Sequence, residues 1–344
     1  MKAARLTQRM APRVLEICAG GGGQASGLEA AGFEHAAAVE IDEAACATLR
    51  ENRHDWEVIP RDVRTIDGKL YKGVDLFAGG VPCPPFSIAG KQLGQDDERD
   101  MFPVALDLVR DAEPRAVLLE NVPGFASAKF EDYRGTILRR LASLGYIADW
   151  KILNACDYGV PQLRPRFVLV ALRPEYFDAF EWPVPVATRR TVGETLADLM
   201  AERGWPGAAA WVQRANGIAP TLVGGSKKHG GADLGPTRAR RRWAELGVEG
   251  ISLADEAPGR DFPIDGMPRL TMRMVARVQG FRDDWAFVGR KTAAYRQVGN
   301  AFPPPVAEAV GRSIFKALAS GVSASAPAPA TRPARRRPVQ LALP

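Results

Sequence analysis

Residues 14–23 read VLEICAGGGG, an apolar run that ends in four consecutive glycines. The apolar run predicts a buried strand, and the glycines predict a turn whose backbone passes close to a ligand. Residues 24–31 follow as a predicted helix, whose N-terminus favours a negative group. The stretch therefore predicts the start of a nucleotide-binding α/β sheet. Gly20, Gly22 and Ala25 also satisfy a loose G-x-G-x-x-A pattern, which leaves a nicotinamide dehydrogenase open.

Short apolar runs alternate with helical stretches through the first half of the chain. This rhythm predicts an α/β fold with a doubly wound, mostly parallel sheet that binds ligands at the carboxyl ends of its strands. The predicted strands are 13–18, 36–40, 74–78, 116–121, 146–155 and 167–172. The predicted helices between them are 24–31, 43–52, 101–111 and 133–144.

The pattern changes near residue 182, where proline clusters, and residues 204–268 are rich in Gly, Pro and Arg with little periodicity. We expect a second, smaller domain of loops and short strands over residues 188–285. Residues 11–187 and 286–319 then form the larger domain. Residues 320–344, rich in Ala, Pro, Ser and Arg, are expected to be a disordered basic tail.

Composition excludes several classes of protein. No apolar run approaches the ~20 residues of a membrane span, and no apolar segment follows the basic N-terminus as in a secretory signal. The four cysteines show no CxxC spacing, which argues against zinc and favours reduced thiols in the cytoplasm. The net charge is +6, but removing the four tail arginines from 46 basic residues leaves 42 against 40 acidic ones. Overall charge therefore does not establish a DNA partner.

Two acidic residues follow predicted strands at places suited to an adenosine ligand. Glu40 stands twenty residues after Gly20, at the end of the second strand, where an acid typically binds a ribose diol. Asp62 follows a third strand and can accept a hydrogen bond from an adenine amino group. Either acid alone is equally typical of a strand end or a helix cap.

Cys83 follows the strand at 74–78, at the carboxyl edge of the sheet. Prolines at 82, 84 and 85 fix the backbone around it. An isolated cysteine is more often a small buried hydrophobe than a nucleophile. A rigid loop at a strand end, however, suits a thiolate that must be aimed, and the polar residues 87–100 beyond it can move over a substrate.

Further charged residues end or precede neighbouring strands. Glu120 ends the strand at 116–121, where partial burial would raise its pKa and let it donate a proton to a ring nitrogen. Arg164 and Arg166 have alternate spacing, which puts both on one side of an extended segment that can reach a phosphate or an active-site anion. A solvated arginine pair and a satisfied strand-end carboxylate are the plainer alternatives.

In its order of motifs, the chain resembles the DNA cytosine-5 methyltransferase family from residue 14 to about residue 307. The matching elements are LEICAGGGG, Glu40, RDV, GGVPCPPFS, ENV, QLRPR, RRTVGETLADL and QVGNAFPPPVA. The resemblance implies a fold that binds S-adenosylmethionine. The cofactor residues it implies are Cys18, Ala19, Gly20, Gly22, Gly23, Glu40, Ile41, Asp62, Val63, Pro82, Asn300 and Ala301.

The resemblance also implies a mechanism. The Cys83 thiolate attacks C6 of a cytosine that is flipped out of the duplex, and Glu120 protonates or hydrogen-bonds N3. Arg166 and Arg164 stabilise the bound base and the thiolate. The chain departs from the family's usual Asp-Leu-Phe-Ala-Gly at Glu16 and Cys18, and Cys18 cannot supply the aromatic contact of a phenylalanine.

Residues 188–285 lie where the family keeps its target-recognition domain, so double-stranded DNA is the expected partner of a monomeric enzyme. Six basic residues and one acid lie between residues 226 and 243, a composition that suits phosphate contacts. The candidate DNA-binding residues are Ser87, Gln92, Thr221, Lys227, Lys228 and Arg240. The expected setting is a restriction–modification system, with a possible companion endonuclease, or a stand-alone bacterial or phage methylase.

Two alternatives share the fold. An RNA cytosine-5 methyltransferase tends to lack a large basic recognition insert, which this chain has. A catalytically silent DNA-binding relative would not need Cys83, Glu120 and Arg166 together. A dehydrogenase explains the glycine turn and nothing else.

Overall fold

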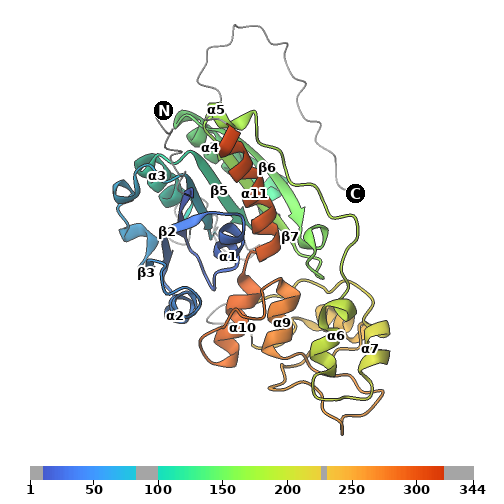
Figure 1. Ribbon diagram of the computed structural model, residues 1–344. Helices are drawn as coiled ribbons and strands as arrows, with labels where there is room; N and C mark the ends of the chain where they lie inside the picture. Colours follow the sequence, from blue (N-terminus) through green and yellow to red (C-terminus); the bar gives the residue numbers. More distant parts are fainter. Residues whose placement is uncertain (1–10, 83–99, 226–230, 321–344) are drawn as a thin grey trace, which may run out of the picture.

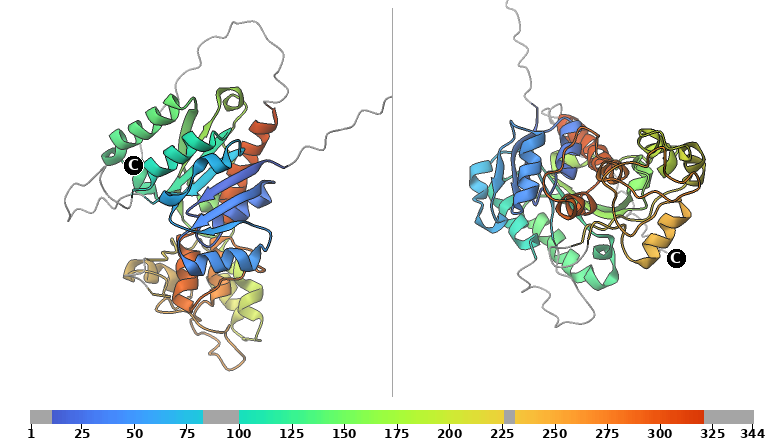
Figure 2. Two further views of the ribbon diagram at one scale, coloured as in Figure 1. Left: turned by 90° about the vertical axis from the view of Figure 1, so that its left-hand side faces the viewer. Right: turned by 90° about the horizontal axis from the view of Figure 1, so that it is seen from below.

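The computed structural model describes residues 11–82, 100–225 and 231–320. They form a seven-stranded sheet with helices on both faces and a largely helical region beyond the carboxyl ends of the strands (Figures 1 and 2). The tail from residue 321 onward lies outside the described residues.

The sheet has the order β3-β2-β1-β4-β5-β7-β6. Its strands are β1 (Arg13–Ile17), β2 (Glu34–Glu40), β3 (Val58–Pro60), β4 (Leu76–Gly80), β5 (Ala116–Asn121), β6 (Ile147–Asn154) and β7 (Pro165–Leu172). Strands β1 to β5 are parallel, whereas β7 runs antiparallel to both β5 and β6. The predicted doubly wound, mostly parallel sheet is confirmed. Because the order reverses at β1 and β4, the carboxyl ends of these two strands form the expected ligand-binding edge.

Each face of the sheet buries a separate apolar cluster. Helices α1 (Gly23–Ala30) and α11 (Pro304–Ser320) pack together on one face, where α11 crosses in front of the sheet in Figure 1. Helices α3 (Phe102–Ala112) and α4 (Glu131–Ser143) cover the other face. Helix α2 (Glu43–Asn52) begins where the Asp42 carboxylate accepts hydrogen bonds from the backbone of Ala44 and Ala45.

In the described part of residues 188–285 the regular elements are helices joined by long loops, so the loops expected there are present and the short strands are not. These helices are α6 (Val192–Ala201), α7 (Ala208–Arg214), α8 (Thr237–Glu245) and α9 (Met272–Gln279); α10 (Lys291–Asn300) follows them, and a short α5 (Pro174–Phe177) precedes them. Helices α7 and α8 bury little beyond Trp211 and Trp243, respectively. One anchoring ring per helix leaves too weak an apolar period to be seen in the sequence.

This helical region is not separated from the sheet by a polar gap. One continuous apolar cluster joins Trp205, Trp211 and Trp243 to Leu49 of α2 and to Trp56 before β3. In the part of the chain that the structure describes, no helix is long and apolar enough to cross a membrane. The described ranges also hold no cluster of His, Cys, Asp and Glu suited to a metal ion.

Candidate active site

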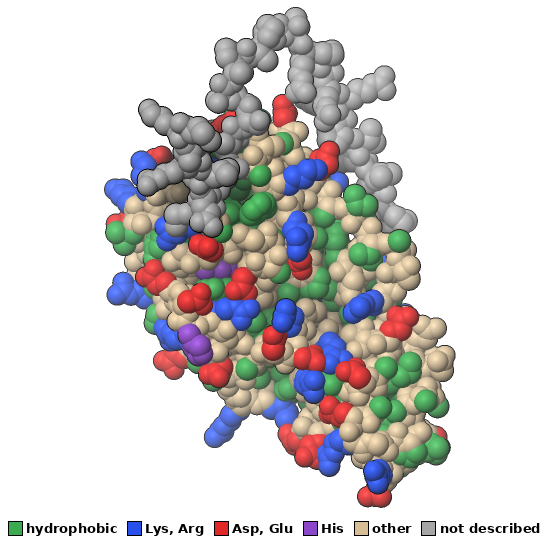
Figure 3. Space-filling view, in the orientation of Figure 1, with side chains coloured by type: hydrophobic (Ala, Val, Ile, Leu, Met, Phe, Trp, Pro, Cys, Tyr) green, Lys and Arg blue, Asp and Glu red, His purple; other side chains and the backbone are tan. Residues whose placement is uncertain are grey.

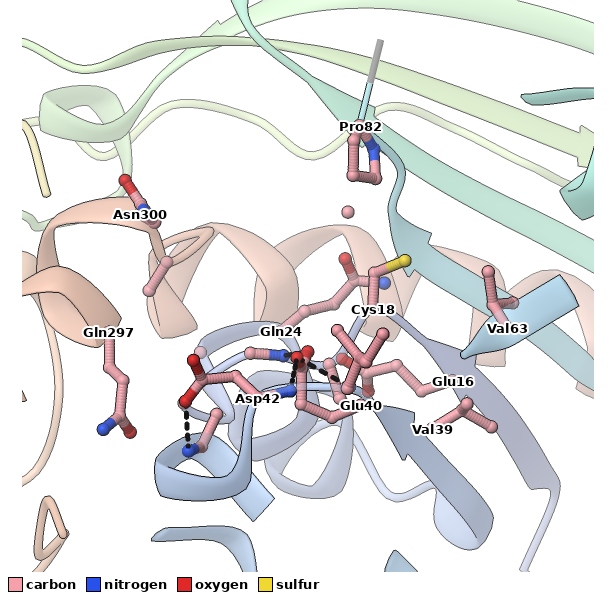
Figure 4. Close-up of a pocket in the computed structure, with 18 of the residues that line it drawn as sticks. Glu16, Cys18, Gln24, Val39, Glu40, Asp42, Val63, Pro82, Gln297 and Asn300 are labelled. Atoms are coloured by element: carbon pink, nitrogen blue, oxygen red, sulfur yellow. Dashed lines mark hydrogen bonds between the residues drawn. The ribbon is translucent and has the colours of Figure 1, made fainter. Parts of the chain in front are cut away.

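A cavity of about 470 Å³ lies at the carboxyl edge of the sheet, between the ends of β1, β2, β4 and β5 and the end of α10 (Figure 4). Its lining combines residues from both ends of the chain. Of the twelve expected cofactor residues, eleven line this cavity: Cys18, Ala19, Gly20, Gly23, Glu40, Ile41, Asp62, Val63, Pro82, Asn300 and Ala301.

The glycine turn gives the cavity its floor. Gly22, the expected cofactor residue outside the lining, has a φ of +86°, and a Cβ there would lie 2.4 Å from the Trp285 ring. A Cβ at Gly23 would lie 2.4 Å from the carbonyl of Phe302. The Trp285 indole N–H also donates to the Gly21 carbonyl at 3.0 Å. The turn therefore needs glycine because segments from the C-terminal end of the chain pack directly on it.

Glu40 is held by backbone donors on two sides. Its carboxylate accepts hydrogen bonds from the N–H groups of Gly20, Ile41 and Asp42 at 2.7 to 2.9 Å. These bonds, drawn in Figure 4, join the end of β2 to the glycine turn. They fix the carboxylate at the cavity wall, where a polar ligand group can reach it.

Asp62 caps the 3₁₀ turn Val63–Thr65 and is bound by a neighbouring side chain. The guanidinium of Arg64 forms an ion pair with the Asp62 carboxylate at 2.5 Å. Hydrogen bonds from the side chain and backbone of Arg64 lower the pKa of Asp62. Asp62 therefore lines the cavity in its ionised form, as one partner of an ion pair with Arg64.

Glu120 and Arg166 form a buried ion pair beside the cavity. The Arg166 Nε lies 2.7 Å from a Glu120 carboxylate oxygen, and both side chains are nearly enclosed. Burial raises the pKa of Glu120, and the nearby guanidinium of Arg166 opposes that rise. Glu120 faces Gly80 in the parallel register of β4 and β5, which puts the carboxyl next to the chain that leads to Cys83. The pair can hold or release a proton at the cavity.

The segment before Cys83 is fixed by two hydrogen bonds. The Asn121 amide donates to the Val81 carbonyl at 2.8 Å, and the Met101 N–H donates to the Pro82 carbonyl at 3.2 Å. Pro82 thereby reaches the cavity close to Glu120. Cys83, Ser87 and Gln92 lie outside the described residues, so the roles expected for them stay predictions. Asn121 was not singled out in the sequence, although it directly follows the candidate acid.

The two arginines before and within β7 have different surroundings. Arg166 pairs with Glu120, as its catalytic role would require. Arg164 is fully buried, and its guanidinium donates to the carbonyls of Leu222, Gly299 and Ala301 instead of to a carboxylate.

The two departures from the family pattern, Glu16 and Cys18, both line the cavity. Burial, reinforced by the charge of Glu40, raises the pKa of the Cys18 thiol to about 12, so it is a poor nucleophile at neutral pH. Glu16 is buried and hydrogen-bonded to His35 at 3.0 Å, and desolvation raises its pKa. The His35 ring in turn stacks on Trp56.

Several polar atoms in the cavity lack protein partners. Within the described residues, both polar atoms of the Gln24 amide, one oxygen of Glu16 and the Gln297 carbonyl oxygen are buried without a hydrogen bond. All three residues line the cavity, and Figure 4 shows the Gln24 amide directed into it. Buried polar groups normally have partners, so these atoms indicate a polar ligand. Gln24 was missed in the sequence; its polarity within the small-residue first turn of α1 was the available signal.

Two of the candidate DNA-binding residues, Thr221 and Arg240, lie within the described ranges, and neither lines the cavity. The Thr221 hydroxyl donates to the Leu163 carbonyl at 2.5 Å, and Arg240 lies on α8, half-buried against Gly250. Lys227 and Lys228 are outside the described residues. On the face shown in Figure 3, basic and acidic side chains are interspersed, which agrees with the small net charge of the chain without its tail.

The chain is similar in sequence to known proteins over most of its length. The family model for C-5 cytosine-specific DNA methylase matches residues 12–316. Type II methyltransferase M.NaeI of Lentzea aerocolonigenes is 58% identical over 311 residues, covering 89% of this chain and 75% of that protein. M.NgoMIV of Neisseria gonorrhoeae is 56% identical over 308 residues, covering 88% and 97%.

Among solved structures, an Entamoeba histolytica methyltransferase aligns with a TM-score of 0.65 at 17% identity, covering 90% of this chain and 99% of its own. A putative DNA modification methyltransferase from a prophage of E. coli aligns with a TM-score of 0.60 at 23% identity, covering 91% and 100%. These two likenesses support the methyltransferase fold. The sequence matches show that the chain belongs to the C-5 cytosine-specific DNA methylase family and is a type II DNA (cytosine-5)-methyltransferase.

Proposed function

We propose that this enzyme methylates C5 of a flipped cytosine in a specific duplex sequence, using S-adenosylmethionine and a covalent adduct of Cys83. The observation that carries the proposal is the buried Glu120–Arg166 pair beside Pro82. A carboxyl whose pKa is raised by burial is suited to protonate a ring nitrogen near neutral pH. The arginine next to it is suited to a developing negative charge.

The cavity fits S-adenosylmethionine. The Glu40 carboxylate, fixed by three N–H groups, is suited to a ribose diol, and the region of Asp62 and Val63 is suited to the adenine. The unpartnered Gln24 amide and the unpartnered carbonyl oxygen of Gln297 are suited to the charged amino-acid end, together with Asn300. When bound, the cofactor supplies an electrophilic methyl group.

The residues of this chain then have distinct tasks. The Cys83 sulfur forms a bond to C6, which makes C5 nucleophilic, while Glu120 gives a proton or a hydrogen bond to N3. Arg166 keeps Glu120 in place and stabilises the bound base. After C5 has gained the methyl group, it loses its proton to water, and the C6–S bond breaks to release the Cys83 thiolate. N3 returns any proton it received to Glu120, which restores the aromatic ring. The target atom is inaccessible inside the duplex, so the base must be flipped into the site.

We assign DNA recognition to residues 188–285, with Thr221, Lys227, Lys228 and Arg240 as candidate contacts, and Ser87 and Gln92 on the catalytic side. More than half of the residues are identical to those of M.NaeI and M.NgoMIV across alignments that span most of the chain. We therefore expect the same target sequence as M.NgoMIV, of which the alignment covers 97%. We also expect a monomer that acts in the cytoplasm beside a companion endonuclease.

Bisulfite sequencing of DNA from a host that expresses this protein tests the proposal. We expect complete protection of one cytosine in one short sequence, matching the map from a host that expresses M.NgoMIV. The RNA alternative is tested by offering purified enzyme duplex DNA and tRNA side by side. Methyl transfer to tRNA alone would contradict the proposal.

A further inference from the structure

Arg164 joins three segments that are far apart in the sequence. Its Nη1 donates to the Leu222 carbonyl at 2.6 Å, and its Nη2 donates to the carbonyls of Gly299 and Ala301 at 2.7 and 2.9 Å. The side chain is fully buried. Burying a guanidinium is costly unless hydrogen bonds offset the lost hydration, and here three backbone carbonyls supply those bonds.

Two buried glutamines extend the same network. The Gln162 amide donates to the Gln279 oxygen at 2.8 Å, and its own oxygen accepts from the Leu222 N–H at 2.8 Å. Gln279 donates to the Ala301 carbonyl at 2.7 Å. Gln162, Arg164 and Gln279, hereafter the polar hub, thus hold both backbone groups of Leu222 and share one carbonyl at Ala301.

The segment held at Leu222 packs tightly on the end of α10. A Cβ at Gly224 would lie 2.5 Å from the Arg296 carbonyl and 2.7 Å from the Asn300 side chain, so the two backbones are in direct contact. The Asn300 amide also donates to the Gly225 carbonyl at 3.1 Å. Arg296 and Asn300 both line the cavity proposed for the cofactor. The wall of that cavity and the segment carrying Thr221 therefore form one packed unit.

The third segment in contact with the hub carries the catalytic arginine. Arg164 precedes Arg166 by two residues, and the Arg164 carbonyl accepts from the Ala155 N–H, which continues the pairing of β6 and β7. A shift of Leu222 or Ala301 would thus act on the backbone that positions Arg166. Glu120 contributes to the electrostatic environment of Arg164, which agrees with their proximity.

We infer that Arg164 is a positioning residue, not a catalytic one. The polar hub couples DNA binding at residues 221–225 to cofactor binding at the part of the cavity wall formed by Arg296 and Asn300 of α10. This rests on the proposed function of the cavity. A ligand on either side favours the same arrangement of the shared backbone, and such coupling must act equally in both directions. The guanidinium is suited to this task because its planar fork reaches several acceptors at once, whereas a lysine offers one point of attachment.

The test measures the Kd of S-adenosylhomocysteine for the full-length enzyme, free and bound to a duplex containing the methylated sequence. The ratio of the two values is the coupling factor, for which we expect about 5- to 150-fold in the unaltered enzyme. Arg164→Lys is expected to bring the factor to within about twofold of unity, because three donors on one nitrogen cannot span the carbonyls that Nη1 and Nη2 reach separately. Gln279→Leu removes the second donor to Ala301 and is expected to lower the factor less.

Arg134→Lys is the matched control. Arg134 is also a buried arginine that donates to two carbonyls, those of Phe125 and Ser127, but its contacts lie away from the hub. We expect it to keep the coupling factor of the unaltered enzyme. The inference is overturned if Arg164→Lys and Gln279→Leu both retain that factor, or if Arg134→Lys lowers it as much.

Failure of the cofactor assignment and failure of the coupling give different results. If the unaltered enzyme does not bind S-adenosylhomocysteine, the cofactor assignment fails, and the coupling fails with it. If it binds with a coupling factor near unity, the cofactor assignment stands and the coupling alone is overturned. Should Arg164→Lys not fold, as judged by its melting curve, Gln279→Leu gives the deciding factor.

Discussion

Two glutamates end neighbouring regions of the same sheet and are equally enclosed, with 9% of each residue exposed. Glu40, at the end of β2, accepts hydrogen bonds from three backbone N–H groups. Glu120, at the end of β5, has one charged partner, Arg166, and burial raises its pKa. Similar burial thus accompanies two different chemical environments.

The difference lies in what holds each carboxylate. Backbone donors cannot move or change charge, so Glu40 is a fixed acceptor suited to binding. The positive charges of Arg166 and, to a smaller extent, Arg164 oppose the desolvation of Glu120 only in part, so this carboxyl can hold a proton and donate it to the cytosine ring. Changes at Glu40 should therefore alter cofactor affinity, and changes at Glu120 should alter the chemical step.

The largest effect is expected from Glu120→Gln. The amide keeps the size of the side chain but cannot transfer a proton to N3, so kcat should fall by about 10²- to 10⁴-fold. The cofactor Kd should change little, because the Glu40 side of the cavity is intact. Initial rates of labelled methyl transfer to plasmid DNA measure the loss. A loss below about tenfold would remove Glu120 from the proposed chemistry.

Glu40→Gln should have a smaller effect, and it should weaken cofactor binding instead of lowering kcat. The amide would place a donor against one of the backbone N–H groups and would lose a charge-assisted bond to the ligand. Loss of a bond worth about 1.5–3 kcal/mol raises the Kd of S-adenosylhomocysteine by roughly 10- to 100-fold. Calorimetry measures this Kd, and kcat at saturating cofactor should stay within a few-fold. A lowered kcat with an unchanged Kd would contradict the assignment of Glu40 to cofactor binding.

Arg166→Gln should shift the pH dependence. Glu120 acts when protonated, so kcat falls as the pH rises through its pKa. Removing the cation that lowers this pKa should move the descending limb to higher pH, even though the rate at the optimum also falls. A pH profile of kcat checks this. A descending limb at the same pH in Arg166→Gln would mean that a group other than Glu120 controls the fall of kcat.

Cys18→Ala should have the smallest effect. A thiol whose pKa is raised to about 12 supplies almost no thiolate at neutral pH, so the rate of methyl transfer should stay within about threefold. The same assay measures it. A loss comparable with that of Glu120→Gln would show that Cys18 takes part in the chemistry.

Much of this arrangement could be predicted because its signals are local. Apolar runs and the glycine turn predicted the sheet, and the twenty-residue spacing from Gly20 predicted where Glu40 would lie. The two are indeed bonded, since the Gly20 N–H donates to the Glu40 carboxylate. Glu120 could be proposed as an acid because it ends an apolar strand that had to be buried.

The rest depends on contacts between distant residues. The partners of Arg164 lie 58 to 137 residues away, so alternate spacing with Arg166 suggested a shared role that its hydrogen bonds do not support. Trp285 reaches the glycine turn across 264 residues. Gln24 looked like an ordinary helix residue until the cavity showed its amide buried without a partner among the described residues.

The most direct test of the central claim uses duplex DNA with 5-fluorocytosine at the target position. Fluorine cannot leave C5 as a proton does, so the bond between the enzyme and C6 persists after methyl transfer. We predict a stable adduct that peptide mass spectrometry places on Cys83, that persists in Cys18→Ala and that is absent in Cys83→Ser. An adduct on another residue, or one that survives Cys83→Ser, would contradict it.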